Sequence, residues 1–215
     1  MQIFKIDQSN PDPEIILEIT DLLRTGGVIA FPTDTFYGLG VDIFNYTAIE
    51  KVFKIKERMY EKPILILISD KTGLTQYVSK KDIPPYAQTL VDKLWPGPLT
   101  LIFNASESIP RILTGTTGKI GIRLPDHTFC RRLVRNLGRP ITATSANISN
   151  MPSMNNPEEV LKTLKDRIDG LVDGGVTKGG LESTVVDVTG NEPAVLREGA
   201  ISLARIKEVS GGEGI

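Results

Sequence analysis

The alternation of short apolar runs with amphipathic stretches constrains the fold of this chain more than any other feature. Apolar runs of strand length occur at residues 28–31, 64–68, 99–103, 120–124, 141–144, 184–188 and 194–196. Between most of them, apolar residues recur every three or four positions, which is typical of helices that bury one face. Alternating strands and helices predict an α/β domain. The close spacing of the last two runs favours an antiparallel pair, so we expect a twisted mixed sheet flanked by helices.

Capping residues mark where the expected helices begin and end. Asp12 and Asn156 each precede a proline, an arrangement that favours the first turn of a helix. Asp126 is expected to cap a helix that Gly138 ends. Further helices are expected at residues 49–58, at 84–94 and after residue 202.

The length of the chain, 215 residues, suits one domain. The sequence contains no internal repeat, low-complexity tract or long linker. We therefore expect a single domain over residues 1–215, with its core at about 12–209 and a loose tail at 210–215.

Composition excludes several kinds of site and partner. Lys and Arg together number 25 and Asp and Glu 26, so the overall charge makes no case for a nucleic-acid or membrane partner. The single cysteine, Cys130, excludes an intrachain disulfide, and the single histidine, His127, excludes a multi-histidine metal site. We expect structural roles for both. A polar amino terminus and the absence of a long apolar run predict a cytoplasmic protein.

The stretch from Val28 to Gly40, V-I-A-F-P-T-D-T-F-Y-G-L-G, joins an apolar run to a group of small hydrogen-bonding side chains. Pro32 ends regular strand pairing because it has no backbone N–H. Thr33, Asp34 and Thr35 follow it. This opening loop is either a polar turn or a small-ligand site, where the glycines let a ligand approach the backbone closely.

Residues 51–62, K-V-F-K-I-K-E-R-M-Y-E-K, carry five basic and two acidic side chains. If the helix continues through this run, Lys54 and Arg58 lie four residues apart and share one face. Such a cluster is suited to hold a polyphosphate, with arginine forking onto oxygens and lysines acting as point charges. A solvated helix face is the competing interpretation.

Two further candidates lie around the strand expected at 120–124. The segment G-T-T-G-K at Gly115 to Lys119 lacks the spacing of a Walker phosphate loop and precedes no helical pattern, which excludes a Walker-type NTPase. Arg123 ends the strand, where a buried charge needs an anionic partner. That partner is either a ligand or an internal salt bridge.

Polar residues also flank the later strands. They lie in T-A-T-S-A-N-I-S-N-M-P-S at 142–153, L-E-S-T at 181–184 and L-R-E-G at 196–199. Loops at strand ends can converge on one crevice, the usual ligand position in open α/β sheets. No histidine or glutamate accompanies the serines of the first segment, which argues against a serine hydrolase. A polar turn is the alternative.

Together, in this order, these segments resemble the YrdC-like family of threonylcarbamoyl-adenylate synthases. The matching pieces span about Gly26 to Ile201 and read F-P-T-D-T-F-Y-G-L-G, K-I-K-E-R, L-W-P-G-P-L-T, G-I-R-L-P, T-S-A-N-I-S, L-E-S-T-V-V-D and L-R-E-G. Their joint occurrence is highly specific. In length the chain is similar to the short, single-domain form of the family.

The resemblance implies a YrdC-like fold with a central substrate crevice and a nucleotidyltransferase activity. Members of the family make L-threonylcarbamoyl-AMP and pyrophosphate from L-threonine, bicarbonate or CO2, and ATP, by adenylyl transfer to N-carboxythreonine. The product supplies N6-threonylcarbamoyladenosine in tRNA. The resemblance further implies Mg²⁺ bound with ATP, no metal site built by the protein alone, and delivery of the product to a tRNA threonylcarbamoyltransferase complex.

The resemblance also assigns residues by motif. It implies L-threonine contacts for Thr35, Leu67, Arg123, Ala143 and Ser183. It implies ATP contacts for Arg58, Lys62, Lys119, Ser145, Ser153 and Arg197, and catalytic roles for Lys56 and Arg58. Because negative charge builds up on phosphate oxygens as pyrophosphate leaves, Lys56, Arg58 and Lys62, with Mg²⁺, are expected to stabilise the transition state.

Four positions depart from the family pattern. Met59 replaces a proline that often follows the arginine, and Asn150 replaces a common glycine. Leu67 stands where some members have a histidine near threonine, so its role there must be apolar. Lys119 occupies a position that is often threonine.

Two other functions stay open. Arg131, Arg132, Arg135 and Arg139 form a basic cluster with no acidic residue between them, which would suit a tRNA contact or a non-catalytic RNA-binding accessory module. The second alternative is a related carbamoyl-transfer domain that acts on another substrate.

Overall fold

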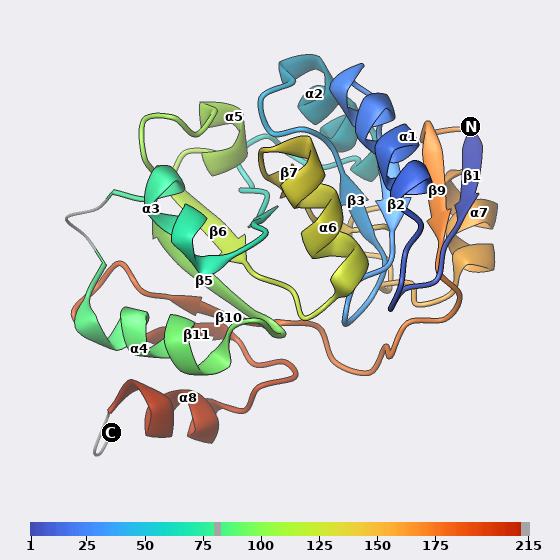
Figure 1. The fold of residues 1–215 in the computed structure, drawn as a ribbon. Helices are drawn as coiled ribbons and strands as arrows, with labels where there is room; N and C mark the ends of the chain where they lie inside the picture. Colours follow the sequence, from blue (N-terminus) through green and yellow to red (C-terminus); the bar gives the residue numbers. More distant parts are fainter. Residues whose placement is uncertain (80–82, 212–215) are drawn as a thin grey trace.

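The strands form two mixed sheets that share a segment of the chain (Figure 1). The computed structural model describes residues 1–79 and 83–211, and within these residues the sheets have the orders β1-β9-β2-β3-β8 and β11-β10-β5-β6-β4-β7. The mixed α/β architecture expected from the sequence is confirmed. The strands divide between two sheets, however, where a single sheet was expected.

The first sheet contains the strand that leads into the opening loop. Its strands are β1 (Gln2–Lys5), β9 (Gly170–Asp173), β2 (Ile29–Phe31), β3 (Gly38–Gly40) and β8 (Thr144–Ser145). β2 is parallel to β9 and antiparallel to β3, so residues 32–37 form the loop of a hairpin. β1 pairs in parallel with β9, although it lies before the expected core of residues 12–209.

The second sheet carries most of the longer apolar runs. Its strands are β11 (Ala194–Arg197), β10 (Thr184–Asp187), β5 (Leu99–Asn104), β6 (Lys119–Arg123), β4 (Ile66–Leu67) and β7 (Ile141–Thr142). β10 and β11 are antiparallel, which confirms the expected pairing of the last two runs. β5 runs parallel to β10 and antiparallel to β6.

Residues 141–145 belong to both sheets. β7 pairs with β4 of the second sheet, and β8 pairs with β3 of the first. Ala143 lies between them and donates its backbone N–H to the carbonyl of Leu65 at 3.1 Å. Strands that change sheets in this way make the corners between packed sheets. The expected strand at 141–144 is therefore divided at Ala143.

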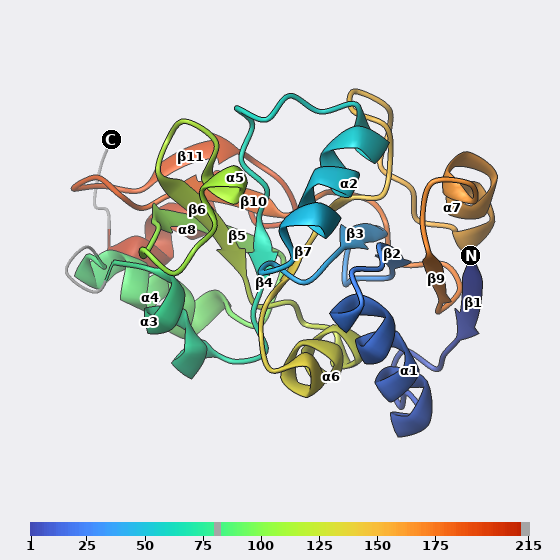
Figure 2. The same ribbon diagram turned by 90° about the horizontal axis from the view of Figure 1, so that it is seen from above.

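Helices cover the outer faces of the sheets. The longer ones are α1 (Pro13–Arg24), α2 (Tyr46–Lys56), α4 (Pro85–Leu94), α6 (Thr128–Leu137), α7 (Pro157–Leu164) and α8 (Leu203–Ser210). Short turns of helix are η1 (Lys71–Gly73), α3 (Leu74–Tyr77) and α5 (Arg111–Thr114). Figures 1 and 2 show α1 beside α6, and the two share an apolar cluster with Phe31 and Leu67. α4 packs against α8 at the opposite end of the molecule.

Most of the expected helix caps are present. Asp12 and Asn156 each accept a hydrogen bond at 2.9 Å from the backbone N–H of the second residue of their helix. The expected cap at Asp126 is wrong: His127 is the N-cap residue of α6, and its Nδ1 accepts the N–H of Cys130 at 3.5 Å. Residues 212–215 of the expected loose tail lie outside the described residues.

His127 is held as a neutral ring. Because Nδ1 accepts a hydrogen bond, Nε2 carries the proton and donates to Gln8 Oε1 at 2.8 Å. Burial lowers the pKa of His127 to about 4, with the charge of Arg123 acting in the same direction and Asp34 opposing it. The unfolded chain therefore takes up a proton at this ring at a higher pH than the folded chain does.

Acidification should consequently weaken the fold through this residue. Between pH 7 and pH 5 the shifted pKa corresponds to a loss of about 2 kcal/mol of unfolding free energy. The variant His127→Asn keeps a good N-cap and removes the titration, so its loss over this interval should be smaller by that amount. Urea denaturation of both proteins at the two pH values measures the difference. Equal losses would show that folding does not lower the pKa of His127.

Candidate active site

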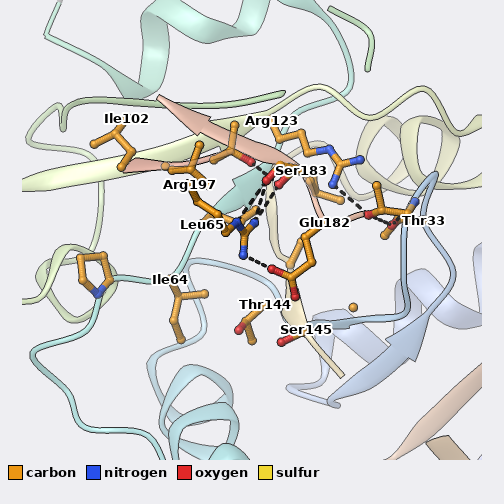
Figure 3. Close-up of a pocket in the computed structure, with 18 of the residues that line it drawn as sticks. Thr33, Ile64, Leu65, Ile102, Arg123, Thr144, Ser145, Glu182, Ser183 and Arg197 are labelled. Atoms are coloured by element: carbon orange, nitrogen blue, oxygen red, sulfur yellow. Dashed lines mark hydrogen bonds and ion pairs between the residues drawn. The ribbon is translucent and has the colours of Figure 1, made fainter. Parts of the chain in front are cut away.

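A cavity of about 590 Å³ opens where the two sheets meet. The first sheet contributes β3 and β8 to its wall, and the second contributes β4, β5, β6, β10 and β11. Figure 3 shows side chains from both sheets pointing into this space, with Thr144 and Ser145 on one side and Ser183 and Arg197 facing them. The corner at residues 141–145 thus forms part of the cavity wall.

Most of the residues assigned from the sequence meet in this cavity. Those that line it are Thr35, Arg58, Leu67, Lys119, Arg123, Ala143, Ser145, Ser153, Ser183 and Arg197. They come from segments that are far apart in the sequence. Lys56 and Lys62 are not among the lining residues.

Arg123 is buried at one side of the cavity, with 7% of its side chain exposed. Its Nη2 forms an ion pair with Asp34 Oδ1 at 2.5 Å, its Nη1 donates to Thr35 Oγ1 at 3.3 Å, and its Nε donates to the Gly97 carbonyl at 3.2 Å. The internal salt bridge that the sequence left open is therefore present. These contacts use three of the five N–H donors of a guanidinium group, so a ligand carboxylate can still be bound at the same residue.

The opening loop is both a structured turn and a cavity wall. Thr33 Oγ1 donates to the Phe36 carbonyl at 2.7 Å and accepts the backbone N–H of Thr35 at 3.1 Å, so Thr33 shapes the loop. Thr177 Oγ1 and the N–H of Gly179 both donate to the Thr35 carbonyl, at 2.8 and 2.9 Å. With its backbone held, Thr35 presents its hydroxyl to Arg123 and the cavity.

Arg58 lines the cavity from the segment just after the end of α2. α2 ends at Lys56, and Glu57 follows with a left-handed φ of 51°, which turns the chain. The expected common helix face of Lys54 and Arg58 is therefore wrong. Arg58 Nη2 donates to the Pro63 carbonyl at 2.8 Å, and burial lowers the pKa of the guanidinium.

Lys56 lies behind the cavity wall, with 1% of the residue exposed. Its Nζ donates to the Ser145 carbonyl at 2.6 Å, the Asn147 carbonyl at 2.9 Å and Asn147 Oδ1 at 2.7 Å. Burial lowers the pKa of Lys56 to about 7, with the charge of Arg58 acting in the same direction. Lys56 therefore does not face the cavity, and its Nζ is directed to protein oxygens where a phosphate contact was expected. The amine instead connects α2 to the end of β8 at Ser145 and to Asn147 in the loop that follows.

Three carboxylates that pair with cations of the cavity were not assigned from the sequence. Lys119 Nζ pairs with Asp187 at 2.8 Å, Arg197 pairs with Glu182, and Arg123 pairs with Asp34. All three lie within motifs that already held assigned residues, T-D-T and L-E-S-T-V-V-D. The family motifs assign mainly cations and hydroxyl groups to the anionic substrates. A partly buried cation also needs an acceptor within the protein, and these carboxylates supply it.

The segment L-R-E-G is fastened to β10 by one buried side chain. Thr184 Oγ1 accepts the N–H groups of Gly199 and Ile201, both at 3.0 Å, and donates to the Ile201 carbonyl. A Cβ at Gly199 would lie 2.2 Å from the carbonyl oxygen of Glu182, so only glycine fits there. This close packing places Arg197 beside Ser183, whose carbonyl accepts hydrogen bonds from Arg197 Nε and Nη2 at 3.2 and 2.9 Å.

Within residues 1–79 and 83–211, no group of three His, Cys, Asp or Glu side chains is placed to hold a metal ion. Over the same residues no helix is long and apolar enough to cross a membrane.

Comparisons with known proteins agree with the motifs. A family model named Sua5/YciO/YrdC, described as telomere recombination, matches residues 21–199. The threonylcarbamoyl-AMP synthase of Pyrococcus abyssi is 39% identical over 189 residues, which are 88% of this chain and 55% of that protein. The one of Bacillus subtilis is 40% identical over 205 residues, or 94% of this chain and 58% of that protein.

A solved structure is similar over nearly the whole chain. P. abyssi Sua5 complexed with L-threonine matches with a TM-score of 0.92 and 35% identity, over 97% of this chain and 61% of that one. The chain thus spans somewhat more than half the length of these relatives. Since the family model covers most of the sequence and the fold agrees, the chain belongs to the Sua5–YciO–YrdC family.

Proposed function

We propose that this chain synthesises L-threonylcarbamoyl-AMP and pyrophosphate from L-threonine, bicarbonate or CO2, and ATP. The observation that carries the proposal is the convergence of ten motif-assigned residues, from both sheets, on one cavity. The names of the two relatives support the reaction, and the threonine complex of P. abyssi Sua5 supports the amino-acid substrate.

L-Threonine would bind around Arg123. The guanidinium group is already oriented by Asp34 and Thr35, so it can bind the substrate carboxylate without first being ordered. Leu67 and Ala143 line the same cavity and would contact the apolar part of the amino acid. Ser183 Oγ, which lies 3.0 Å from Thr100 Oγ1, would complete the pocket.

ATP would bind along the wall that carries most of the cations. The lining residues assigned to it are Arg58, Lys119, Ser145, Ser153 and Arg197. Lys62, an exposed residue of the loop after α2, would join them only through its long side chain. Lys56 would act as a positioning residue, because its amine holds the carbonyl of Ser145.

The reaction needs orientation and charge stabilisation more than a protein nucleophile. The amine of threonine adds to CO2, forming a C–N bond and releasing a proton, which gives a carbamate. A carbamate oxygen then attacks the α-phosphorus of ATP, and the bond to pyrophosphate breaks. Holding both substrates in one cavity makes this step effectively intramolecular. Arg58 offers a fixed positive charge to the phosphates, because a guanidinium group stays protonated in proteins even where burial lowers its pKa.

Mg²⁺ would enter with the nucleotide. The cavity carboxylates Glu182 and Asp187 are each paired with a cation and do not form a metal cage. That donor set suits a cation held mainly by phosphate oxygens and water, as is usual for Mg²⁺ with nucleotides. When bound, the ion would neutralise charge on the phosphates.

The RNA-binding alternative is less well supported. Arg131 pairs with Asp126 at 4.0 Å, Arg132 donates to the Pro11 carbonyl at 3.2 Å, and Arg139 pairs with Asp42 at 3.2 Å. Three of the four arginines in the basic cluster thus have partners within the fold. Three further expectations stay predictions: a tRNA contact, delivery of the product to a threonylcarbamoyltransferase complex, and a cytoplasmic location.

The proposal requires that pyrophosphate release from ATP depend on both L-threonine and bicarbonate. Omitting either one should reduce release to the background rate, and L-threonylcarbamoyl-AMP should be detected by mass spectrometry. Release that depends on carbamoyl phosphate instead would identify a carbamoyl-transfer domain. Salt-sensitive RNA binding without turnover would favour the accessory module.

Arg58→Ala should lower the rate of pyrophosphate release about 100-fold or more, because a transition-state cation is lost. Lys54→Ala is the matched control, since it removes a positive charge from an exposed position in α2, four residues before Arg58. The control should retain the parental rate. Near-normal turnover by the arginine variant would remove Arg58 from the mechanism.

Arg123→Lys should raise the KM for L-threonine by about 10- to 100-fold, because lysine cannot replace a fork that contacts Asp34, Thr35 and a carboxylate together. The KM for ATP should change little. Steady-state titration of each substrate separates the two effects. A shift confined to ATP would assign Arg123 to the nucleotide. Arg131→Lys, at a half-buried arginine outside the cavity lining, serves as control.

A further inference from the structure

Glu182 joins two side chains that the family motifs assign to ATP. Its Oε1 accepts a hydrogen bond from Ser153 Oγ at 2.5 Å, and its Oε2 pairs with Arg197 Nη1. Ser153 lies in the loop that follows β8, whereas Arg197 ends β11, so the carboxylate bridges opposite walls of the cavity. Figure 3 shows Glu182 reaching toward the centre of the pocket from the segment just before β10.

Arg197 does not need Glu182 to hold its position. Its Nε and Nη2 atoms donate to the Ser183 carbonyl, and Nη2 also lies 3.3 Å from Ser183 Oγ. One edge of the guanidinium group is therefore anchored to β10. The remaining Nη1 end, together with the Ser153 hydroxyl, presents donors to an acceptor group between the walls.

We propose that Glu182 is an internal placeholder for an anionic group of the nucleotide. In the nucleotide-free protein its carboxylate takes up the donors of Ser153 and Arg197, and ATP binds by displacing it. The inference rests on the assignment of this cavity to ATP. A carboxylate satisfies the same pair of donors that a phosphate oxygen would.

The position of Glu182 allows this exchange. Its side chain is 37% exposed, and that of Arg197 is 44% exposed, so the carboxylate can turn into water without leaving a buried, unpaired charge. Partly exposed ion pairs are weak, and salt screens them. The placeholder therefore occupies the donors of Ser153 and Arg197 and lowers nucleotide affinity only modestly.

Glu182→Gln should tighten the binding of a non-hydrolysable ATP analogue about fivefold, because the competing charge is removed. Glu182→Ala should tighten it as well, and provides a second variant if the first fails to fold. The KM for L-threonine should stay within about twofold of the parental value. Glu192→Gln, which removes the same charge from an exposed residue between β10 and β11, should leave analogue binding unchanged.

Isothermal titration calorimetry at low salt and at 0.5 M NaCl measures these affinities. The difference between the parent and Glu182→Gln should shrink at high salt, which a purely structural role would not produce. Weaker or equal analogue binding by both variants at low salt would overturn the placeholder role. Failure of the parental protein to bind the analogue at all would instead overturn the assignment of the cavity to ATP.

Discussion

The passage of residues 141–145 from one sheet to the other is the constraint on which the cavity depends. β7 completes the second sheet and β8 completes the first, with Ala143 bonded to Leu65 between them. Two sheets joined at a corner cannot pack flat against each other there, so a space is left that both sheets line. A continuous strand in place of this corner would join the edges of the sheets and close that space.

Buried polar side chains hold the loops that line the cavity. The amine of Lys56 binds the carbonyls of Ser145 and Asn147, and the hydroxyl of Thr184 binds three backbone groups around Gly199 and Ile201. A loop cannot satisfy all of its own backbone groups, so a single side chain that does so also fixes its shape. The polar residues behind the cavity are therefore as important to its geometry as those that face it.

Each cation that lines the cavity has an acceptor within the protein. Arg123, Lys119 and Arg197 each pair with a carboxylate, and Arg58 is bonded to a backbone carbonyl. The most buried of these pairs, Arg123 with Asp34, orients a guanidinium group, whereas the partly exposed pair of Arg197 with Glu182 can open. The ion pair between Arg123 and Asp34 is too buried to be broken cheaply, whereas a ligand can replace the more exposed pair between Arg197 and Glu182.

The sequence by itself determined the mixed α/β class, most helix boundaries and ten of the residues that meet in the cavity. Apolar periodicity and capping residues are local signals, and the family motifs name side chains one by one. Only the tertiary structure decided that β1 and β9 pair, that residues 141–145 divide between two sheets, and that Lys56 faces a loop rather than the cavity. It also decided which carboxylate neutralises each cation, and that His127 rather than Asp126 caps α6. Apart from the cap of α6, which is a local contact, these features depend on contacts between segments far apart in the chain, which no local pattern records.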